Sequence, residues 1–105
     1  MDSNSYKISE NAIKDIDSIL TYSSKDLSNI LAAENLYNKI FDTINNILSF
    51  PHIGVQINNY FIENSSIRKI SIDNYIMYYK YNENKKLIII LRIVSSKKDI
   101  NTYNI

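Results

Sequence analysis

One glycine and one proline punctuate this chain, and both fall within the segment Pro51–Gly54. Glycine and proline are the residues that most often interrupt helices and strands. A chain of 105 residues with so little punctuation therefore has room for long regular elements on either side of one break. The residues before and after this break follow different hydrophobic periods, so the sequence divides into two unlike halves.

The first half has the period of amphipathic helices. Ser5–Ile8 is a candidate short strand, and Ser9 is a suitable N-cap for a helix that follows it. A polar stretch at residues 22–26 interrupts the first helical pattern, and from Ile30 apolar residues again step by three and four as far as Leu48. Two amphipathic helices joined by a short turn predict an antiparallel helical hairpin.

The second half has the period of strands. In a strand over residues 68–72, Arg68, Ile70 and Ile72 share one face and Lys69 and Ser71 the other. Asp73 and Asn74 suit a two-residue hairpin turn after it. Further strands are predicted for three segments: a poorer one at Val55–Ile62, an aromatic one at Tyr75–Tyr81, and Leu87–Val94, which we expect to be central and buried on both faces.

The order of these elements predicts an α+β fold. We expect an N-terminal short strand and an antiparallel helical hairpin packed on a twisted, mainly antiparallel sheet of about four strands. The length and the hydrophobic fraction of 45% fit a single domain over residues 1–105.

Composition excludes several kinds of site. There is no cysteine, which rules out disulfides, thiolate metal ligands and a cysteine nucleophile, and one histidine cannot build a multi-histidine zinc site. We therefore expect no metal and no cofactor. The N-terminus has neither the basic nor the apolar region of a signal peptide, and the aliphatic run Leu87–Leu91 is too short to span a bilayer. These features predict a cytoplasmic protein without a membrane partner.

Charge is unevenly divided between the halves. Residues 1–50 carry four lysines against seven acidic residues, or −3, and residues 51–105 carry eight Lys and Arg against four acidic residues, or +4. The net charge of +1 is too small to indicate a nucleic-acid or membrane partner. The positive charge of the second half nevertheless marks it as the place where an anionic partner is expected to dock. The alternative interpretation is a solvated surface.

Several short segments together resemble the RelE/ParE superfamily, the plasmid-stabilisation proteins. The resemblance extends from Tyr6 to Asp99 and rests on the order and spacing of these segments. No single segment is specific, because each consists largely of residues that form the fold. The matching positions are Ser9, Ala12, Asp15 and Ile16; Ile44, Ile47, Leu48, Phe50, Pro51 and Gly54; Ile67–Ile72; Tyr75–Tyr79; Ile90–Ile93; and Lys97–Asp99.

The resemblance implies the toxin of a type II toxin–antitoxin system, which inhibits growth and is neutralised by a cognate antitoxin. Relatives divide by target: ParE-like toxins bind DNA gyrase and need no catalytic groups, whereas RelE-like toxins cut mRNA on the ribosome. Whether the chain is an enzyme, and whether it forms a homodimer or a toxin–antitoxin hetero-oligomer, stays open. A non-toxic relic that still binds antitoxin is a further alternative.

The ribonuclease alternative has four candidate catalytic residues, all by resemblance. Its chemistry, attack of a ribose 2′-hydroxyl on the adjacent phosphate, needs a base, an acid and cations. Arg68 matches a phosphate-binding strand arginine, although an exposed cation paired with a helix acid explains it equally well. Lys97, Lys98 and Tyr103 occupy the basic C-terminal segment, for which a solvated tail is the simpler interpretation.

Missing cations favour the gyrase mechanism. RelE-like ribonucleases present lysines just before the strand that contains the arginine, whereas residues 52–66 here contain no Lys or Arg and Glu63 is their only charge. His52 fits a loop surface better than a general base. Tyr75, Tyr78, Tyr79 and Tyr81 fit strand packing better than base stacking. We therefore expect a ParE-like toxin that uses its helical hairpin and basic tail.

Overall fold

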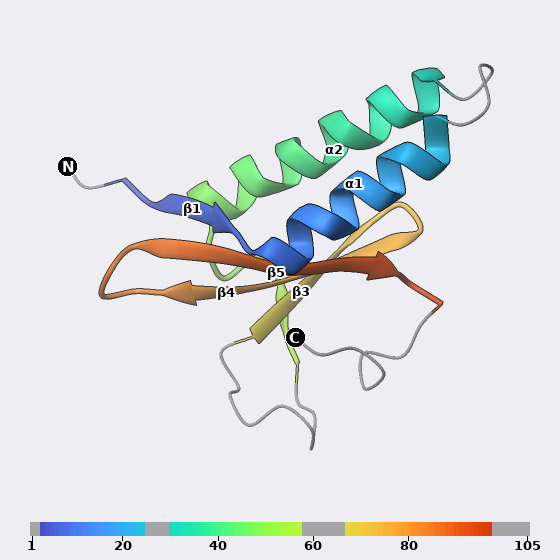
Figure 1. Cartoon of the computed structure of the whole chain (residues 1–105). Coiled ribbons are helices and arrows are strands. Elements are labelled where there is room, and N and C mark those ends of the chain that lie inside the picture. Colours follow the sequence, from blue (N-terminus) through green and yellow to red (C-terminus); the bar gives the residue numbers. More distant parts are fainter. Residues whose placement is uncertain (1–2, 25–29, 58–66, 98–105) are drawn as a thin grey trace.

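The computed structural model describes residues 3–24, 30–57 and 67–97, and within them two helices lie on one face of a mixed sheet (Figure 1). The helices are α1 (Glu10–Ser24) and α2 (Ile30–Ser49). The strands are β1 (Ser5–Ile8), β2 (Val55–Gln56), β3 (Ile67–Ile72), β4 (Tyr75–Asn82) and β5 (Leu87–Ser95).

The strand order is β1-β5-β4-β3-β2. Strand β1 runs parallel to β5, and the other neighbouring pairs are antiparallel. The predicted α+β class is confirmed, although the sheet has five strands rather than about four. The short β2 pairs with β3 through Val55 and Gln56 at the edge of the sheet and lies at the start of the poorer strand predicted for Val55–Ile62. Residues 58–62 of that prediction lie outside the described residues.

Ser9 fixes the start of α1 and also ties it to the sheet. Its hydroxyl accepts a hydrogen bond from the Ala12 N–H at 3.1 Å, the usual role of an N-cap. The same hydroxyl donates to the carbonyl oxygen of Leu91 at 2.9 Å, and the Ser9 N–H donates to the carbonyl oxygen of Ile90 at 3.0 Å. The predicted cap is therefore confirmed, and its bonds to β5 set where the helix meets the sheet.

The core lies between the helical hairpin and the sheet. The period of α2 turns five residues inward, while alternation along the strands supplies the facing layer. Fully burying one such aliphatic side chain contributes roughly 1.5–3 kcal/mol. The main core residues are Ala12, Leu36, Ile40, Ile44, Ile47, Ile72, Met77, Tyr79, Ile88, Ile90 and Ile93.

Two tight turns connect β3, β4 and β5. Asp73, in the first turn, has a φ of 52°, which confirms the predicted Asp73-Asn74 turn, since aspartate and asparagine tolerate this region. In the second turn Lys86 has a φ of 51°, and the Asn82 side chain accepts a hydrogen bond from the Lys85 N–H at 3.1 Å. Both hairpins are thus specified largely by local chemistry.

The opposite face of the sheet is less deeply packed. Ile67, Tyr78 and Val94 form a second small buried cluster there. Ile89 and Leu91 of β5 are only half-buried, so the expected burial of this strand is complete on the helix-covered face alone. Neither helix of the described ranges is long and apolar enough to cross a membrane.

Candidate functional site

Arg68 holds the loop that joins α2 to β2. Its Nη1 donates to the carbonyl oxygen of Gly54 at 2.7 Å and to that of His52 at 3.2 Å. The residue is half-buried, and its pairing with Tyr79 places it on the helix-covered face of the sheet. One nitrogen of this guanidinium therefore bonds backbone carbonyls of the protein's own loop.

Tyr79 completes the same network from inside the core. Its hydroxyl donates to the carbonyl oxygen of Pro51 at 2.9 Å and accepts from the Gly54 N–H at 2.9 Å. Burial raises the pKa of the Tyr79 hydroxyl above its usual value, while the Gly54 hydrogen bond and the charge of Arg68 oppose that rise. A neutral tyrosine thus satisfies two backbone groups that would otherwise be buried without partners.

Gly54 allows the loop to approach this closely. A Cβ atom at this position would lie 2.7 Å from the Tyr79 hydroxyl and 2.9 Å from the carbonyl oxygen of Lys69. Both distances are shorter than real Cβ contacts, so a larger residue would push the loop off the sheet. The single glycine therefore serves close packing, and its φ is not positive.

His52 lies outside this network, at the surface. Its Nε2 is 3.0 Å from Oε1 of Glu83, and the two side chains are 57% and 69% exposed. The ring also meets Tyr81 edge-on, with centroids 5.7 Å apart. These contacts place His52 at the loop surface, where the sequence suggested it would be.

The second arginine is also engaged within the fold. Nε and Nη2 of Arg92 donate to the two carboxylate oxygens of Asp15 at 2.7 and 2.9 Å, and Asp15 also accepts from the Ile93 N–H at 3.0 Å. The two side chains are only 16% and 13% exposed. This forked pair joins α1 to β5, and both belong to the motif positions singled out in the sequence.

Among the four residues proposed for phosphate chemistry, the structure describes two. Arg68 pairs with Tyr79, whereas Ser95, just before Lys97, lies near the other end of β4 beside Tyr75. These two rows are four residues apart, about 13 Å along a strand. Lys97 is exposed in the turn after β5 and is thus separated from Arg68. Lys98 and Tyr103 lie outside the described residues.

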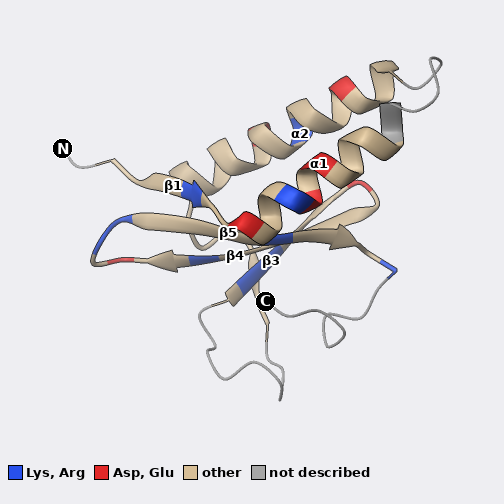
Figure 2. Ribbon diagram, in the orientation of Figure 1, with Lys and Arg blue, Asp and Glu red and all other residues tan. Residues whose placement is uncertain are grey.

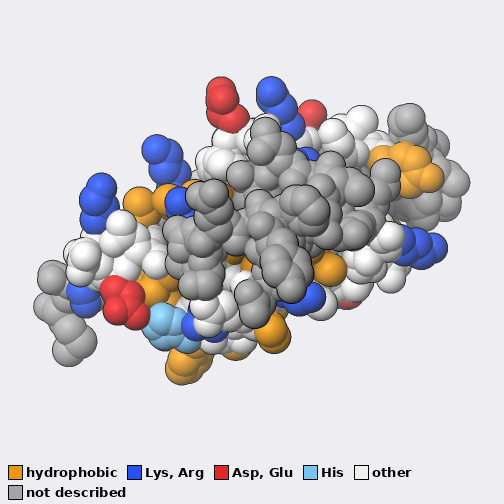
Figure 3. Space-filling view, turned by 90° about the horizontal axis from the view of Figure 1, so that it is seen from below, with side chains coloured by type: hydrophobic (Ala, Val, Ile, Leu, Met, Phe, Trp, Pro, Cys, Tyr) orange, Lys and Arg blue, Asp and Glu red, His pale blue; other side chains and the backbone are white. Residues whose placement is uncertain are grey.

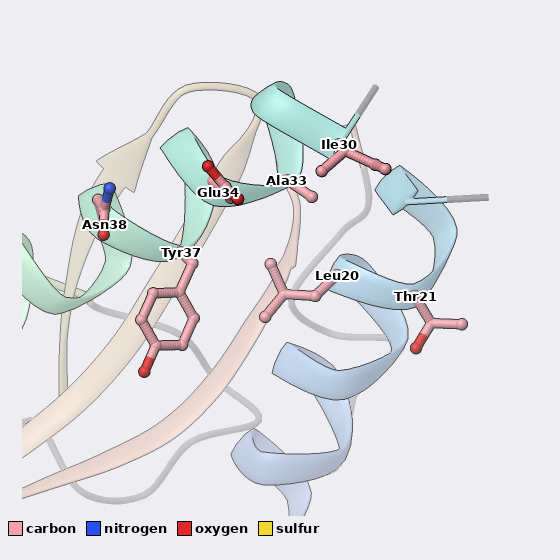
Figure 4. A pocket seen from close by; sticks show the side chains of 7 residues that line it. All are labelled: Leu20, Thr21, Ile30, Ala33, Glu34, Tyr37 and Asn38. Atoms are coloured by element: carbon pink, nitrogen blue, oxygen red, sulfur yellow. The ribbon is translucent and has the colours of Figure 1, made fainter. Parts of the chain in front are cut away.

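A groove lies between the two helices. It has a volume of about 540 Å³ and is lined by Leu20, Thr21, Ile30, Ala33, Glu34, Tyr37 and Asn38. Figure 4 shows Leu20 of α1 and Tyr37 of α2 projecting into the space between the helices.

A second hollow, of about 280 Å³, lies beside the hairpin and the end of β1. It shares Leu20 with the first groove, and its lining is mainly apolar. The lining residues are Ile8, Ile13, Ile16, Asp17, Leu20 and Phe41.

Large apolar side chains stay exposed along this hairpin. Ile13 is 54% exposed, Leu31 71% and Tyr37 49%. Sequence analysis anticipated a role for the hairpin but none of these residues, because an apolar residue in a helical pattern can face either the core or the solvent. Ile30 of this pattern, for example, is 42% exposed, whereas Ile40 is fully buried.

Comparison with known proteins identifies the family of this chain. A family model described as the ParE toxin of the type II toxin–antitoxin system parDE matches residues 6–100. None of the curated proteins matches the sequence significantly.

Three solved structures share the fold. A chromosomal ParDE system from P. aeruginosa has a TM-score of 0.66 and 19% identity, covering 89% of this chain and 96% of that one. The RelBE2 toxin–antitoxin complex from Mycobacterium tuberculosis has a TM-score of 0.57 and 12% identity, covering 90% and 99%. The isolated RelE toxin from E. coli has a TM-score of 0.58 and 11% identity, covering 96% and 92%.

At these low sequence identities the structural similarity shows only that the fold is shared. The family model is a match of sequence, and it spans most of the chain. Together with the motif order, the match shows that this protein belongs to the ParE toxin family of type II toxin–antitoxin systems.

Proposed function

We propose that this toxin inhibits growth in the ParE manner, by binding DNA gyrase, and that a cognate antitoxin neutralises it. The observation that carries the proposal is the position of Arg68, whose guanidinium donates to the carbonyl oxygens of Gly54 and His52. An arginine that holds its own loop is poorly placed to bind a phosphate, which a ribonuclease mechanism requires.

The surroundings of Arg68 support the same choice. The second arginine, Arg92, is paired with Asp15 across the fold. His52, the one imidazole that could move a proton near neutral pH, contacts Glu83 at the surface, while Arg68 bonds only its backbone carbonyl. Within the described residues, a base, an acid and a phosphate-binding cation are therefore not assembled as one cluster.

The groove of the helical hairpin is the surface we assign to the antitoxin. The solved relatives include toxin–antitoxin complexes. An amphipathic segment of the antitoxin would bury its apolar face against Leu20, Ile30 and Tyr37, a common mode of peptide recognition. If gyrase uses the same hairpin, bound antitoxin blocks the toxin by occupying its contact surface.

The test is controlled expression in a bacterial host with pulse-labelling of DNA and protein synthesis during the first minutes. The gyrase mechanism predicts that DNA synthesis stops first, with DNA breaks and an SOS response, while translation continues. If protein synthesis stops first, the RelE-like ribonuclease becomes the better explanation. If growth is unaffected, the chain is a non-toxic antitoxin-binding relic.

An Arg68→Gln variant sharpens the test. Glutamine can still donate to a loop carbonyl but has no charge for a phosphate. Under the gyrase mechanism we expect growth arrest to persist at equal protein levels. Loss of toxicity in a folded variant that still binds antitoxin would instead point to phosphate chemistry at Arg68.

A further inference from the structure

The strands of the sheet carry basic but no acidic residues, and one of the basic residues, Arg92, pairs with Asp15 of α1. The five strands contain Lys7, Arg68, Lys69, Lys80 and Arg92 and no aspartate or glutamate. Figure 2 shows this separation, with acidic residues mainly on the helices and turns and basic residues on the strands. Both arginines are bonded within the fold, so the lysines are the charges available to a partner.

Register brings two of these lysines together although 73 residues separate them. Lys7 and Lys80 both pair with Ile89, one from each side. Paired residues point to the same face, so both lysines project from the face opposite the helices. Two strand spacings of about 4.8 Å put their Cα atoms roughly 10 Å apart. Lys7 is exposed and Lys80 half-buried.

The β4–β5 turn adds two more charges at the same end of the sheet. Lys85 and Lys86 are exposed, and the Lys86 carbonyl oxygen accepts from the Ser5 N–H at 2.9 Å, which holds the turn beside β1. The one acid of this turn, Glu83, contacts His52. Figure 3, which views the face opposite the helices, shows basic side chains projecting at the end where this acid and the histidine lie.

We propose that Lys7, Lys80, Lys85 and Lys86, here termed the lysine end, bind the phosphate backbone of duplex DNA. The proposal rests on the gyrase mechanism and deepens it, because gyrase acts on duplex DNA. It assigns to the toxin a contact with the DNA in addition to its contact with the enzyme.

The chemistry of the lysine end selects a duplex backbone. Lysine ammonium groups bind phosphates as point charges, and contacts to the phosphate backbone carry no sequence information, so we expect binding that is independent of sequence. Binding of single strands needs exposed aromatic rings on which bases stack. On this face the tyrosine in the centre of β4, Tyr78, is only 3% exposed.

The first experiment titrates a fluorescently labelled 20-base-pair duplex with the full-length toxin at several salt concentrations. Four phosphate contacts predict a slope of about −3.6 for log K against log salt, or ~150-fold weaker binding at 200 mM than at 50 mM. A Lys85→Gln/Lys86→Gln variant should halve the slope and bind ~60-fold more weakly at 0.1 M salt.

A matched control removes the same charge from the helical hairpin. Lys14→Gln/Lys39→Gln changes two exposed lysines of α1 and α2 and should leave the slope and affinity unchanged. Equal weakening by both variants, or a slope near zero for the unaltered toxin, would overturn the proposal. So would displacement of the duplex by poly-L-glutamate at equal charge, since the surface would then suit an acidic protein equally well.

A gyrase cleavage assay separates this proposal from the function on which it rests. If the unaltered toxin traps no cleaved DNA with gyrase, the gyrase mechanism fails whatever the titration shows. If the unaltered toxin and the Lys85→Gln/Lys86→Gln variant trap cleaved DNA equally, the mechanism stands and the role of the lysine end falls. We expect the variant to trap less while the control variant traps as much as the unaltered toxin.

Discussion

Three residues attach the loop between α2 and β2 to the sheet. Gly54 lets the loop approach the sheet closely, and the Tyr79 hydroxyl bonds the Gly54 N–H. Arg68 donates to the carbonyl oxygen of Gly54. The contact between Gly54 and Tyr79 depends on the missing Cβ atom, which would lie 2.7 Å from the Tyr79 hydroxyl. At this scale the arginine is a structural residue, which is why its presence in the motif does not by itself imply catalysis.

The Tyr79 hydroxyl gives a prediction that depends on pH. Tyr79→Phe leaves the Pro51 carbonyl and the Gly54 N–H without their partner, so the free energy of unfolding at pH 7 should fall by about 1–3 kcal/mol. Because burial raises the pKa of Tyr79 in the folded state, its stabilising effect is complete below about pH 10 and is lost as pH rises through the folded-state value.

Urea unfolding of both proteins from pH 7 to pH 11 measures this difference. The gap between the unaltered toxin and Tyr79→Phe should narrow above pH 10. Tyr37→Phe is the control, since its ring is about half-exposed, and it should unfold within about 0.5 kcal/mol of the unaltered toxin. A gap that widens with pH would contradict the assigned role of the hydroxyl.

At the scale of the element, α1 is joined to the sheet at two points. Ser9 bonds to β5 at the first residue of the helix, and Asp15 pairs with Arg92 almost two turns later. The two attachments fix both the position and the direction of α1 across β5. The exposed apolar residues of the hairpin therefore keep a defined geometry relative to the sheet, as a docking surface requires.

Asp15→Asn should loosen this attachment. It removes the carboxylate that faces the largely buried charge of Arg92, which costs about 3–5 kcal/mol of unfolding free energy. Asp17→Asn, an exposed position on the same helix, is the control and should change stability by less than about 0.5 kcal/mol. Replacing both partners, as Asp15→Leu/Arg92→Met, should recover most of the loss in a denaturant titration. Equal losses in the single and double variants would refute the pairing argument.

At the scale of the whole molecule, two surfaces of different chemistry lie on opposite sides. The helical hairpin presents exposed apolar residues along its groove, and the sheet presents lysines from the other face. An apolar groove suits a folded or folding protein segment, whereas the lysines suit phosphates. The two contacts that we propose, with a protein and with DNA, would therefore use opposite sides of the molecule.

The apolar surface predicts which variants escape the antitoxin. Ile13→Glu/Tyr37→Glu places two charges where an antitoxin helix would bury apolar area, so binding should weaken at least 30-fold while the toxin stays folded. The matched control, Asn11→Glu/Asn35→Glu, adds the same charges about 200° around each helix and should bind normally. Calorimetric titration with the antitoxin measures both, and undiminished binding of the first variant would remove the groove from consideration.

The sequence by itself determined the types and order of the elements, the N-cap at Ser9, the turn at Asp73 and the membership of a toxin family. These features depend on residues that are near neighbours in the chain, so periodicity and turn chemistry are enough to predict them. The strand predicted from Val55 is described only as the two-residue β2, which carries little periodic signal of its own.

The tertiary structure alone decided what the charged residues do. Alternation along β3 places Arg68 on a face, but only the loop that packs there determines whether it meets a phosphate or the carbonyl of Gly54. Asp15 is bonded to Arg92, 77 residues away. Lys7 and Lys80 come close because both pair with Ile89 of β5, one from each side. Such partners are set by strand register and helix packing, which depend on the whole core and leave no signal in the local sequence pattern.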